Sequence, residues 1–374
     1  MISKDKMSVT VGVAFVWFTT QFGGGFASGN QLRQYFVQFG VWAFLTCVLA
    51  QCIGAFYQWY ALKYAKKHEV YDYKSFNDSF YGKYSPIFSN LYELVYVVTL
   101  CVAPAAAFAT GVSTMESAFG LNHWIGTAFT GVFIFIVAVY GTNVVRKVAS
   151  TLSVMIVAGL LIVYIPNIAA QWGDISANIS ASMAAPAPAG KAIWTGIVYA
   201  AFQLASIGLL VQHAKPFSSP DDAKTSMVYG LGVNAVICLM AVLGLMAITN
   251  DPEFPTASIP LLILVNRGVA PQLLRPIISI LIVLGSISTA VNMIAGMSNR
   301  VCKSLDANFD PTAKPGKNVI IVTLICTVVA FAIAQLGLNK IVGIGYKYLG
   351  YLTIPVIMIP YVVHMITTKF DTAE

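Results

Sequence analysis

The chain has 374 residues, of which 57% are hydrophobic and only 10% are charged, and its mean hydropathy is +0.75. A soluble domain carries about 25% charged residues, so this composition indicates an integral membrane protein. The length suffices for roughly ten membrane helices of about 20 residues with short loops. We attribute the formal net charge of +7 to basic loops on one side of the membrane, and we expect no nucleic-acid partner.

The first hydrophobic segment, residues 8–38, breaks in its own middle. Three consecutive glycines, Gly23 to Gly25, are followed by Phe26, Ala27, Ser28 and Gly29 before apolar sequence resumes. Such a break leaves backbone groups that lipid cannot satisfy, so it is tolerated only where it is buried in protein or lines a cavity. Amide N–H groups at a half-helix start favour an anion, and carbonyls at a half-helix end favour a cation. The segment therefore predicts a solute-binding site.

Nine further spans follow, and the stretch 258–269 is too short to cross, so we expect it to be a re-entrant or surface helix. The predicted spans are 41–65, 86–115, 123–142, 148–171, 191–214, 225–249, 272–302, 318–337 and 341–367. With both termini inside, sixteen Lys and Arg residues fall in inner loops and five on the outer side. This bias predicts a multi-pass protein of the plasma (inner) membrane with both termini in the cytoplasm.

The two halves of the chain correspond. The sixth span carries a polar, small-residue patch, Ala201 to Gly208, at the place that matches the break in the first span. With five spans per half, the second copy enters the membrane inverted, as in many secondary transporters. We expect a first repeat over 1–171, an extracellular linker over 172–190, a second repeat over 191–368 and a cytoplasmic tail over 369–374.

The sequence Phe22-Gly23-Gly24-Gly25-Phe26-Ala27-Ser28-Gly29-Asn30-Gln31 resembles the G-A-G-F-A-S-G-Q-E signature of the YkvI-like bacterial membrane family. Gln31 stands at or beside the position of the acidic residue of that signature. The resemblance implies membership of the amino acid–polyamine–organocation superfamily. It also implies the LeuT-type fold: all-α, with ten transmembrane helices in a 5+5 inverted repeat and helices 1 and 6 broken.

We expect the substrate to lie between the two breaks. Backbone amides from Gly24 to Ala27 would hold a carboxylate, and freed carbonyls of the sixth span would hold an amine. The alternative for the glycines is close helix packing, and for Gln203 and Ser206 it is interhelical hydrogen bonding. The predicted substrate-binding residues are Gly23, Gly24, Gly25, Phe26, Ala27, Ser28, Tyr96, Phe202, Gln203, Ala205 and Ser206.

The eighth span offers oxygen ligands for a coupling Na⁺. Gly285, Ser288 and Thr289 lie on one helical face by their i, i+3, i+4 spacing. In LeuT-type sodium symporters such a set meets two carbonyls before the first break, and the resemblance assigns these to Thr19 and Phe22. The alternative is that the hydroxyls bond back to their own helix. No other metal or cofactor site is expected, because the His and Cys residues are scattered.

Two charged residues lie within spans. Glu93 and Lys347 are candidates for a gate or a coupling group, although each lies near enough to a membrane surface to reach it. Proton coupling or uncoupled transport of an amino acid or amine therefore stays open, as does a non-transporting sensor on the same fold.

The leading prediction is a secondary active transporter that imports a small amino acid or related zwitterion by alternating access, coupled to Na⁺. A channel would need a continuous polar lining, whereas the polar residues cluster at mid-depth. An enzyme would need a convergent nucleophile and base or a metal set, and the spans carry neither. The sequence also has no P-loop, so ATP does not drive the chain directly.

Overall fold

The computed structural model describes residues 4–21, 23–140, 142–306, 309 and 314–372, and these residues contain helices and loops but no β-strand. Within this described part, seven helices are long and apolar enough to cross a membrane, or up to nine if each of two bent helix pairs counts as one span. The predicted all-helical membrane architecture is therefore confirmed. The ten-span count, its division into two inverted repeats and the proposed boundaries between them stay predictions.

The helices of the first half follow the predicted spans closely. Their bounds are α1 Lys4–Gln21, α2 Gly24–Ala27, α3 Asn30–Tyr35, η1 Val37–Phe39, α4 Trp42–Lys67, α5 Tyr73–Tyr81, η2 Gly82–Tyr84, α6 Ser85–Phe119, α7 His123–Tyr140, α8 Thr142–Ala170 and α9 Trp172–Ala184.

The second half begins with another interrupted segment and ends with an irregular one. Its elements are α10 Ala189–Leu204, α11 Ile207–Leu210, η3 Val211–Ala214, α12 Asp222–Met246, α13 Pro260–Arg267, α14 Pro271–Leu305, α15 Lys317–Ala334, α16 Leu338–Lys340, η4 Ile341–Gly345, α17 Tyr346–Thr353, η5 Ile354–Met358 and α18 Ile359–Thr367.

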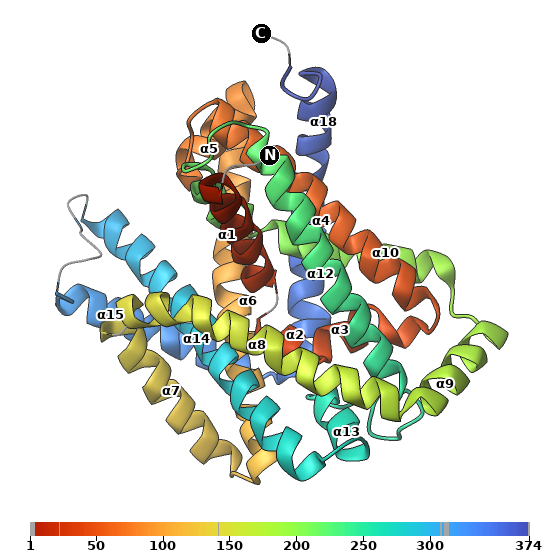
Figure 1. Ribbon diagram of the computed structural model, residues 1–374. Coiled ribbons are helices and arrows are strands. Elements are labelled where there is room, and N and C mark those ends of the chain that lie inside the picture. The colour runs from red at the N-terminus through yellow and green to blue at the C-terminus, as the bar shows by residue number, and fades with distance from the viewer. Residues whose placement is uncertain (1–3, 22, 141, 307–308, 310–313, 373–374) are drawn as a thin grey trace.

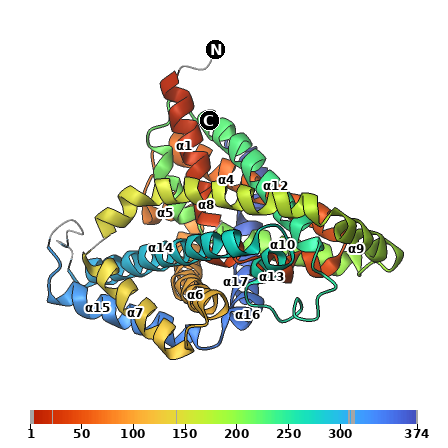
Figure 2. The same cartoon turned by 60° about the horizontal axis from the view of Figure 1, so that its bottom comes forward.

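The core is built from helices that are distant in sequence. The two 35-residue helices α6 and α14 pack against each other, and Figure 2 shows α14 lying across α6. Helix α10 packs on α4 and α17, while α12 packs on α1 and α4 (Figure 1). The broken segments α1–α3 and α10–α11 therefore lie among long helices, as the backbone groups at a break require.

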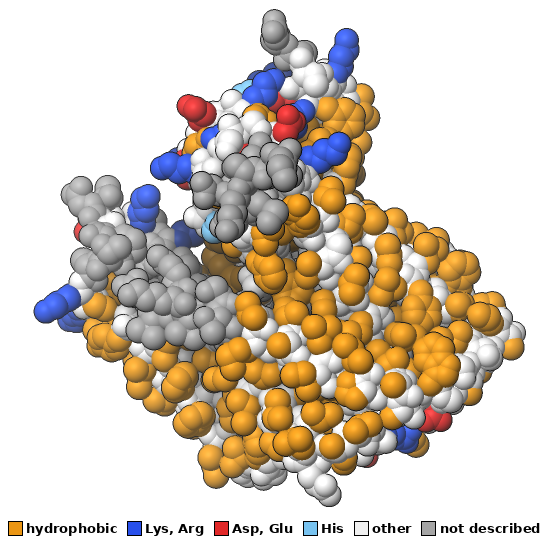
Figure 3. All heavy atoms as spheres, in the orientation of Figure 1, with side chains coloured by type: hydrophobic (Ala, Val, Ile, Leu, Met, Phe, Trp, Pro, Cys, Tyr) orange, Lys and Arg blue, Asp and Glu red, His pale blue; other side chains and the backbone are white. Residues whose placement is uncertain are grey.

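The molecule has two chemically different ends. Both termini, α5 and α18 lie at the top of Figure 1, which we call the terminal face, and α9 and α13 lie at the opposite end, the distal face. Charged side chains gather at the terminal face, and hydrophobic side chains cover most of the remaining surface in that view (Figure 3). This distribution is what the predicted charge bias requires. The assignment of the terminal face to the cytoplasm stays a prediction.

The C-terminal end is fixed to the terminal face by ion pairs. The carboxylate of Asp371 lies 3.0 Å from Nε2 of His68 and 3.6 Å from Nζ of Lys67. Nζ of Lys63 also donates to the carbonyl of Phe370 at 2.8 Å. These contacts hold the end of α18 against the end of α4.

Three segments differ from regular membrane-spanning helices: α13, α9 and the last predicted span. The expected short helix at 258–269 is present as α13, which begins at Pro260, where the missing N–H of proline costs no helical bond. The predicted linker 172–190 contains the helix α9, bent by 78° from α8. The bend occurs where Gln171 donates from Nε2 to the carbonyl of Leu264, at 3.2 Å. The last predicted span contains two π-helical turns, and the second of them includes Pro355, which lacks the N–H for a regular bond.

Candidate functional site

The first predicted break is present. Helix α1 ends at Gln21, a bend at Gly23 precedes the single turn of α2, and α3 begins at Asn30. Gly29 has a φ of +83°, a left-handed conformation that strongly favours glycine. Phe22, whose carbonyl is one of the predicted Na⁺ ligands, lies outside the described residues.

Two of the backbone amides predicted to hold a carboxylate already donate hydrogen bonds within the protein. The N–H groups of Phe26 and Ala27 donate to the carbonyl of Gly23 at 3.0 and 3.1 Å. The prediction that a solute carboxylate binds these two amides is therefore wrong for this conformation, because one turn of helix satisfies them. The amides of Gly24 and Gly25 remain the candidates at this helix start.

Three predicted substrate residues are structural parts of the break. Phe26 is 1% exposed and packs in the apolar core, as does Ala27. The hydroxyl of Ser28 donates to the carbonyl of Gly25 at 2.9 Å, and the carbonyl of Ser28 accepts the amide of Leu261 at 3.1 Å. None of the three lines the central cavity described below. They hold the turn rather than contact a solute.

The second predicted break is also present. Helix α10 ends at Leu204, and the axis bends by 41° before the chain continues as α11 at Ile207. At the bend, the amides of Ala205 and Ser206 donate to the carbonyls of Phe202 and Gln203 at 3.3 and 3.2 Å. The carbonyl of Gln203 also accepts the hydroxyl of Ser206 at 2.6 Å, so both of its lone pairs are used, whereas the carbonyl of Phe202 retains a second lone pair.

A tyrosine from α6 supports this break. The hydroxyl of Tyr92 donates to the carbonyl of Ala205 at 3.4 Å and accepts the amide of Gly208 at 2.9 Å. Tyr92 is fully buried, so these bonds replace the helical bonds lost at the bend without water. Tyr92 therefore caps the broken helix by bonding to both sides of the bend.

The two breaks open into one central cavity of about 60 Å³. Its walls come from α1–α3, α6, α10–α11, α14 and α17. The lining residues are Thr20, Gln21, Gly23, Gly25, Gln31, Thr99, Ala103, Ala107, Phe202, Gln203, Ser206, Leu209, Thr289, Met293, Tyr346 and Leu349. Of the predicted substrate residues, the structure brings together Gly23, Gly25, Phe202, Gln203 and Ser206.

Gln31 is the most informative lining residue that the substrate prediction omitted. It is 5% exposed, and its Oε1 has no hydrogen-bond partner among the residues that the structure describes. Its amide lies over the backbone of Gly25, where a Cβ would come within 2.9 Å of Nε2. A buried amide with unmet bonding capacity at a cavity wall is costly unless a ligand or water completes it. The family signature drew attention to this position through its acidic residue, but not to this contact.

The other cavity-lining residues that the substrate prediction omitted lie on helices whose rotation about their own axes the sequence does not fix. Thr99, Ala103 and Ala107 form the α6 wall, and the small side chains of the two alanines leave the space that the cavity occupies. Tyr346 lies opposite, where its ring stacks on Phe202 with centroids 4.7 Å apart. The alanine run around Pro104 was the available sequence signal for this wall.

The predicted ion ligands divide between two environments. Thr289 lines the cavity, and its Oγ1 lies 3.4 Å from the position that a Cβ on Gly23 would take. The same hydroxyl donates to the carbonyl of Gly285 at 2.9 Å, so the back-bonding that we considered as the alternative does occur. Thr19 and Ser288 do not line the cavity. Within the described part of the chain, no group of three or more His, Cys, Asp or Glu residues is placed to hold a metal.

Tyr96 and Glu93 belong to a different cluster, towards the terminal face. Glu93 forms an ion pair with Arg300 and accepts the hydroxyl of Tyr73 at 3.1 Å. The guanidinium of Arg300 lies 4.7 Å from the ring centroid of Tyr73 and 5.1 Å from that of Tyr96. Tyr96 therefore does not line the cavity as predicted, because its ring is turned to the cation on α14. We call Tyr73, Glu93, Tyr96 and Arg300 the terminal cluster.

Lys347 faces away from the site. It is exposed on α17, and its Nζ lies 5.9 Å from the ring centroid of Tyr351. This position fits a lysine that reaches the membrane surface along an aromatic side chain, the alternative considered above.

A second polar network, the distal latch, joins α3 to residues more than 220 positions away. Nδ2 of Asn30 donates to the carbonyl of Ser258 at 2.9 Å and to Oδ1 of Asn339 at 2.7 Å. Arg33 donates to the same Oδ1 at 2.6 Å and to the carbonyl of Pro255. These bonds tie the second half of the first broken span to the 255–258 loop and to α16.

Comparison with solved structures supports the fold. No protein-family model and no curated protein sequence matches the chain. Its fold is similar to that of a Na⁺-coupled sialic acid symporter. That structure was solved in a substrate-bound, outward-open state; it is 13% identical, has a TM-score of 0.51, and the match covers 96% of this chain and 88% of the other. A manganese transporter of Eremococcus coleocola also matches, with 13% identity, a TM-score of 0.47 and 96% and 86% coverage.

Proposed function

We propose that this protein is a secondary active transporter of a small amino acid or a related zwitterion. The observation that carries the proposal is that two interrupted helical segments, α1–α3 and α10–α11, are distant in sequence and line the same cavity. Paired breaks of this kind mark the substrate site in transporters, because they expose backbone dipoles where lipid cannot reach. The likeness of the fold to a Na⁺-coupled symporter supports the same reading.

The size and charge of the cavity indicate the solute class. A water molecule needs about 10–15 Å³ of such space, so about 60 Å³ holds roughly four to six waters. Glycine and alanine have comparable numbers of heavy atoms. None of the described residues that line the cavity is charged, so a solute without net charge fits best. Its carboxylate would meet the start of α2, and its ammonium the carbonyls at the end of α10.

Alternating access requires a closure on each side of the cavity. The distal latch at Asn30 and Arg33 supplies bonds between α3 and the second half of the chain. The terminal cluster supplies an ion pair and two cation–π contacts between α6, α5 and α14. We propose that these two networks break in turn, so that the cavity opens to one face at a time, and that the terminal face is cytoplasmic.

We propose Na⁺ as the coupling ion, held by the carbonyls of Thr19, Phe22 and Gly285 and the hydroxyls of Ser288 and Thr289. The position of Thr289 against Gly23 supports this assignment, because it places an oxygen ligand from α14 beside the break. The bond from Thr289 to Gly285 favours a second candidate, transport without Na⁺, because both groups are satisfied there without an ion.

Flux into proteoliposomes tests the proposal and separates the two candidates. The full chain is reconstituted, and uptake of radiolabelled glycine, L-alanine and L-leucine is measured with an inward gradient of Na⁺, of K⁺ or of protons. We expect glycine and alanine to exceed leucine, and the Na⁺ gradient to stimulate uptake. Equal uptake with Na⁺ and K⁺ would select proton-coupled or uncoupled transport. Absence of both uptake and binding for all three solutes would contradict the proposed substrate class.

A variant that fills the cavity controls for leak and for binding elsewhere. Gly23→Leu places a large side chain towards Thr289, in the space where the solute would lie. The variant should lose uptake and still elute as a single species in detergent. Normal uptake by this variant would show that the solute does not bind between the two breaks.

A further inference from the structure

A second cavity, separate from the central one, lies near the distal face. Its volume is about 430 Å³, and it shares no lining residue with the central cavity. It lies between the α3–η1 segment, α9 and the loop that follows α12. Its lining residues are Arg33, Val37, Gln38, Phe39, Gly40, Asn178, Ala181, Ser182, Ala185, Ala187, Met246, Thr249, Asn250, Phe254 and Pro255. We call it the distal cleft.

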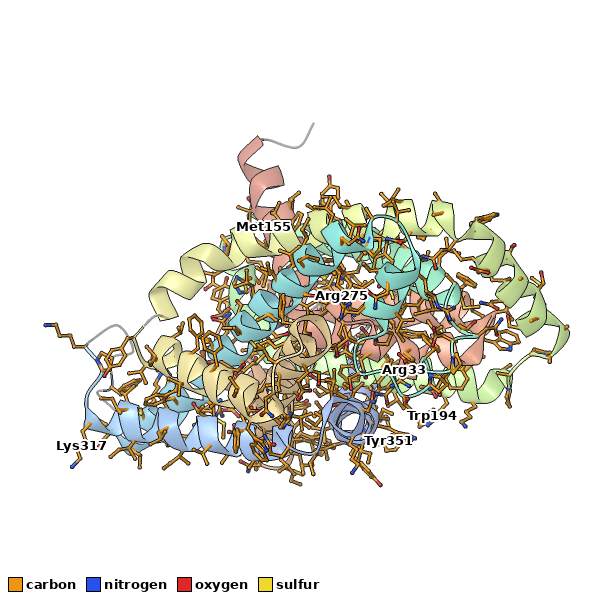
Figure 4. The ribbon with its side chains drawn as sticks, turned by 90° about the horizontal axis from the view of Figure 1, so that it is seen from below. Arg33, Met155, Trp194, Arg275, Lys317 and Tyr351 are labelled. Carbon is orange, nitrogen blue, oxygen red and sulfur yellow. The ribbon has the colours of Figure 1, made fainter. Side chains whose placement is uncertain are left out.

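Arg33 is the charged residue of this lining, and its charge is not neutralised. The side chain is 9% exposed, and Figure 4, which looks onto the distal face, shows Arg33 within the outline of the molecule. Its guanidinium donates to the neutral oxygens of Pro255 and Asn339, and its Nε has no hydrogen-bond partner in the described part of the chain. Among the described residues, no carboxylate forms an ion pair with it. A buried cation without a counter-charge is strongly unfavourable, because neutral acceptors replace only part of its hydration.

The other described lining residues are uncharged: Gln38, Asn178, Ser182, Thr249 and Asn250 are polar, and the remainder are apolar or glycine. Hydrogen bonds hold part of the polar set in place. Nδ2 of Asn178 donates to the carbonyl of Met246 at 2.8 Å, and Asn250 donates to Oδ1 of Asn178. Thr249 and Ser182 add hydroxyl groups near the same wall. The amides of Asn178 and Asn250 each have a second N–H that can donate to an anion, whereas the hydroxyls of Ser182 and Thr249 already donate to the carbonyls of Ile179 and Met246 at 2.8 and 3.2 Å. None of these four side chains carries a negative charge that would repel an anion.

We propose that the distal cleft binds a small monovalent anion, with its charge against Arg33. The volume exceeds what a bare inorganic ion needs, which favours a short organic carboxylate over a halide. The cleft shares no lining residue with the central cavity, so this inference does not depend on transport. Its occupation would stabilise the distal latch, because Arg33 belongs to both structures.

The test is anion-dependent thermal stability of the purified full chain in detergent at low ionic strength. The probes are sodium propionate and sodium chloride, each titrated separately. We expect a saturable rise in melting temperature with propionate. Arg33→Gln should weaken the apparent affinity at least tenfold, whereas Arg33→Lys, which keeps the charge, should lose less. The matched control is Lys191→Gln, which removes an exposed cation at the start of α10 and should titrate like the parent.

Because Arg33 also holds the latch, its variants can destabilise the fold directly. Ala181→Trp avoids this difficulty, since it fills the cleft from α9 and leaves Arg33 unchanged. It should abolish the saturable shift. Saturation by chloride as well as propionate would still support an anion site and identify inorganic anions as occupants. A linear response to both salts, or an equal shift in Ala181→Trp and the parent, would overturn the proposal, whatever the result of the uptake assay.

Discussion

The substitution Gly25→Ala tests whether Gln31 contacts the transported solute. A Cβ at position 25 would lie 2.9 Å from Nε2 and 3.4 Å from Cδ of the Gln31 side chain. Comfortable contacts between heavy atoms need about 3.5–4.0 Å, so the amide must move by roughly 0.5–1 Å. The backbone of Gly25 is helical, and alanine is favoured over glycine in a helix by up to about 1 kcal/mol. The variant is therefore expected to fold.

The expected loss follows from the hydrogen bond that the displaced amide makes. A hydrogen bond to a solute contributes about 0.5–1.5 kcal/mol, which corresponds to roughly 2- to 12-fold in affinity. We expect the apparent affinity for the best transported amino acid to fall by this factor in Gly25→Ala. The measurement is concentration-dependent uptake, or equilibrium binding of the same radiolabelled amino acid to the purified protein.

The control is Gly23→Ala, which adds the same methyl group two residues earlier. There the new Cβ would lie 3.4 Å from Oγ1 and 3.6 Å from Cγ2 of Thr289, which is ordinary contact. This variant should stay within about twofold of the parent. A double-mutant cycle adds Gln31→Ala, and the loss in Gly25→Ala should largely disappear in that background, because both changes remove one interaction. Additive losses, or a larger loss in Gly23→Ala, would refute the assignment of Gln31.

Three further outcomes follow from the structure. Ser288→Ala combined with Thr289→Val should remove the Na⁺ dependence of uptake before it affects folding. In the parent protein, Na⁺ should raise the affinity for substrate, and substrate should raise the affinity for Na⁺ by the same factor. Equal substrate binding in Na⁺ and in a large inert cation would contradict this site. Glu93→Gln should change uptake by less than about fivefold, because the half-exposed ion pair of Glu93 contributes about 0–1 kcal/mol. Arg300→Gln also loses two cation–π contacts, so it should reduce uptake by more than Glu93→Gln does. Asp72→Ala should cost about 1 kcal/mol of stability at pH 7, since Asp72 caps α5. Burial raises the pKa of Asp72, but hydrogen bonds from Ser75 and Lys74 lower this pKa by more. The stabilisation by the cap is therefore present above about pH 4 and should vanish as the pH falls through the lowered pKa.

The sequence by itself determined the properties that depend on local composition. Hydropathy alone separates a membrane chain from a soluble one, because the bilayer requires long apolar helices. The glycines at 23–25 and 29 predicted the break in the first span, because consecutive glycines disfavour a helix wherever the chain lies. The short helix near residue 260 was likewise predicted from the sequence, because the stretch 258–269 is too short to cross the membrane. None of these features needs a partner from elsewhere in the chain.

Only the tertiary structure decided which side chains reach the cavity. Gln31 covers Gly25, Tyr92 caps a break more than 110 residues away, and Tyr96 turns to Arg300. A membrane helix is apolar on its lipid-facing side as well as its protein-facing side, so its sequence does not fix its rotation as an amphipathic helix would. For the same reason Lys347 could be placed in a span but not on its exposed face. Rotation is set by packing against distant helices, and with it the roles of these residues.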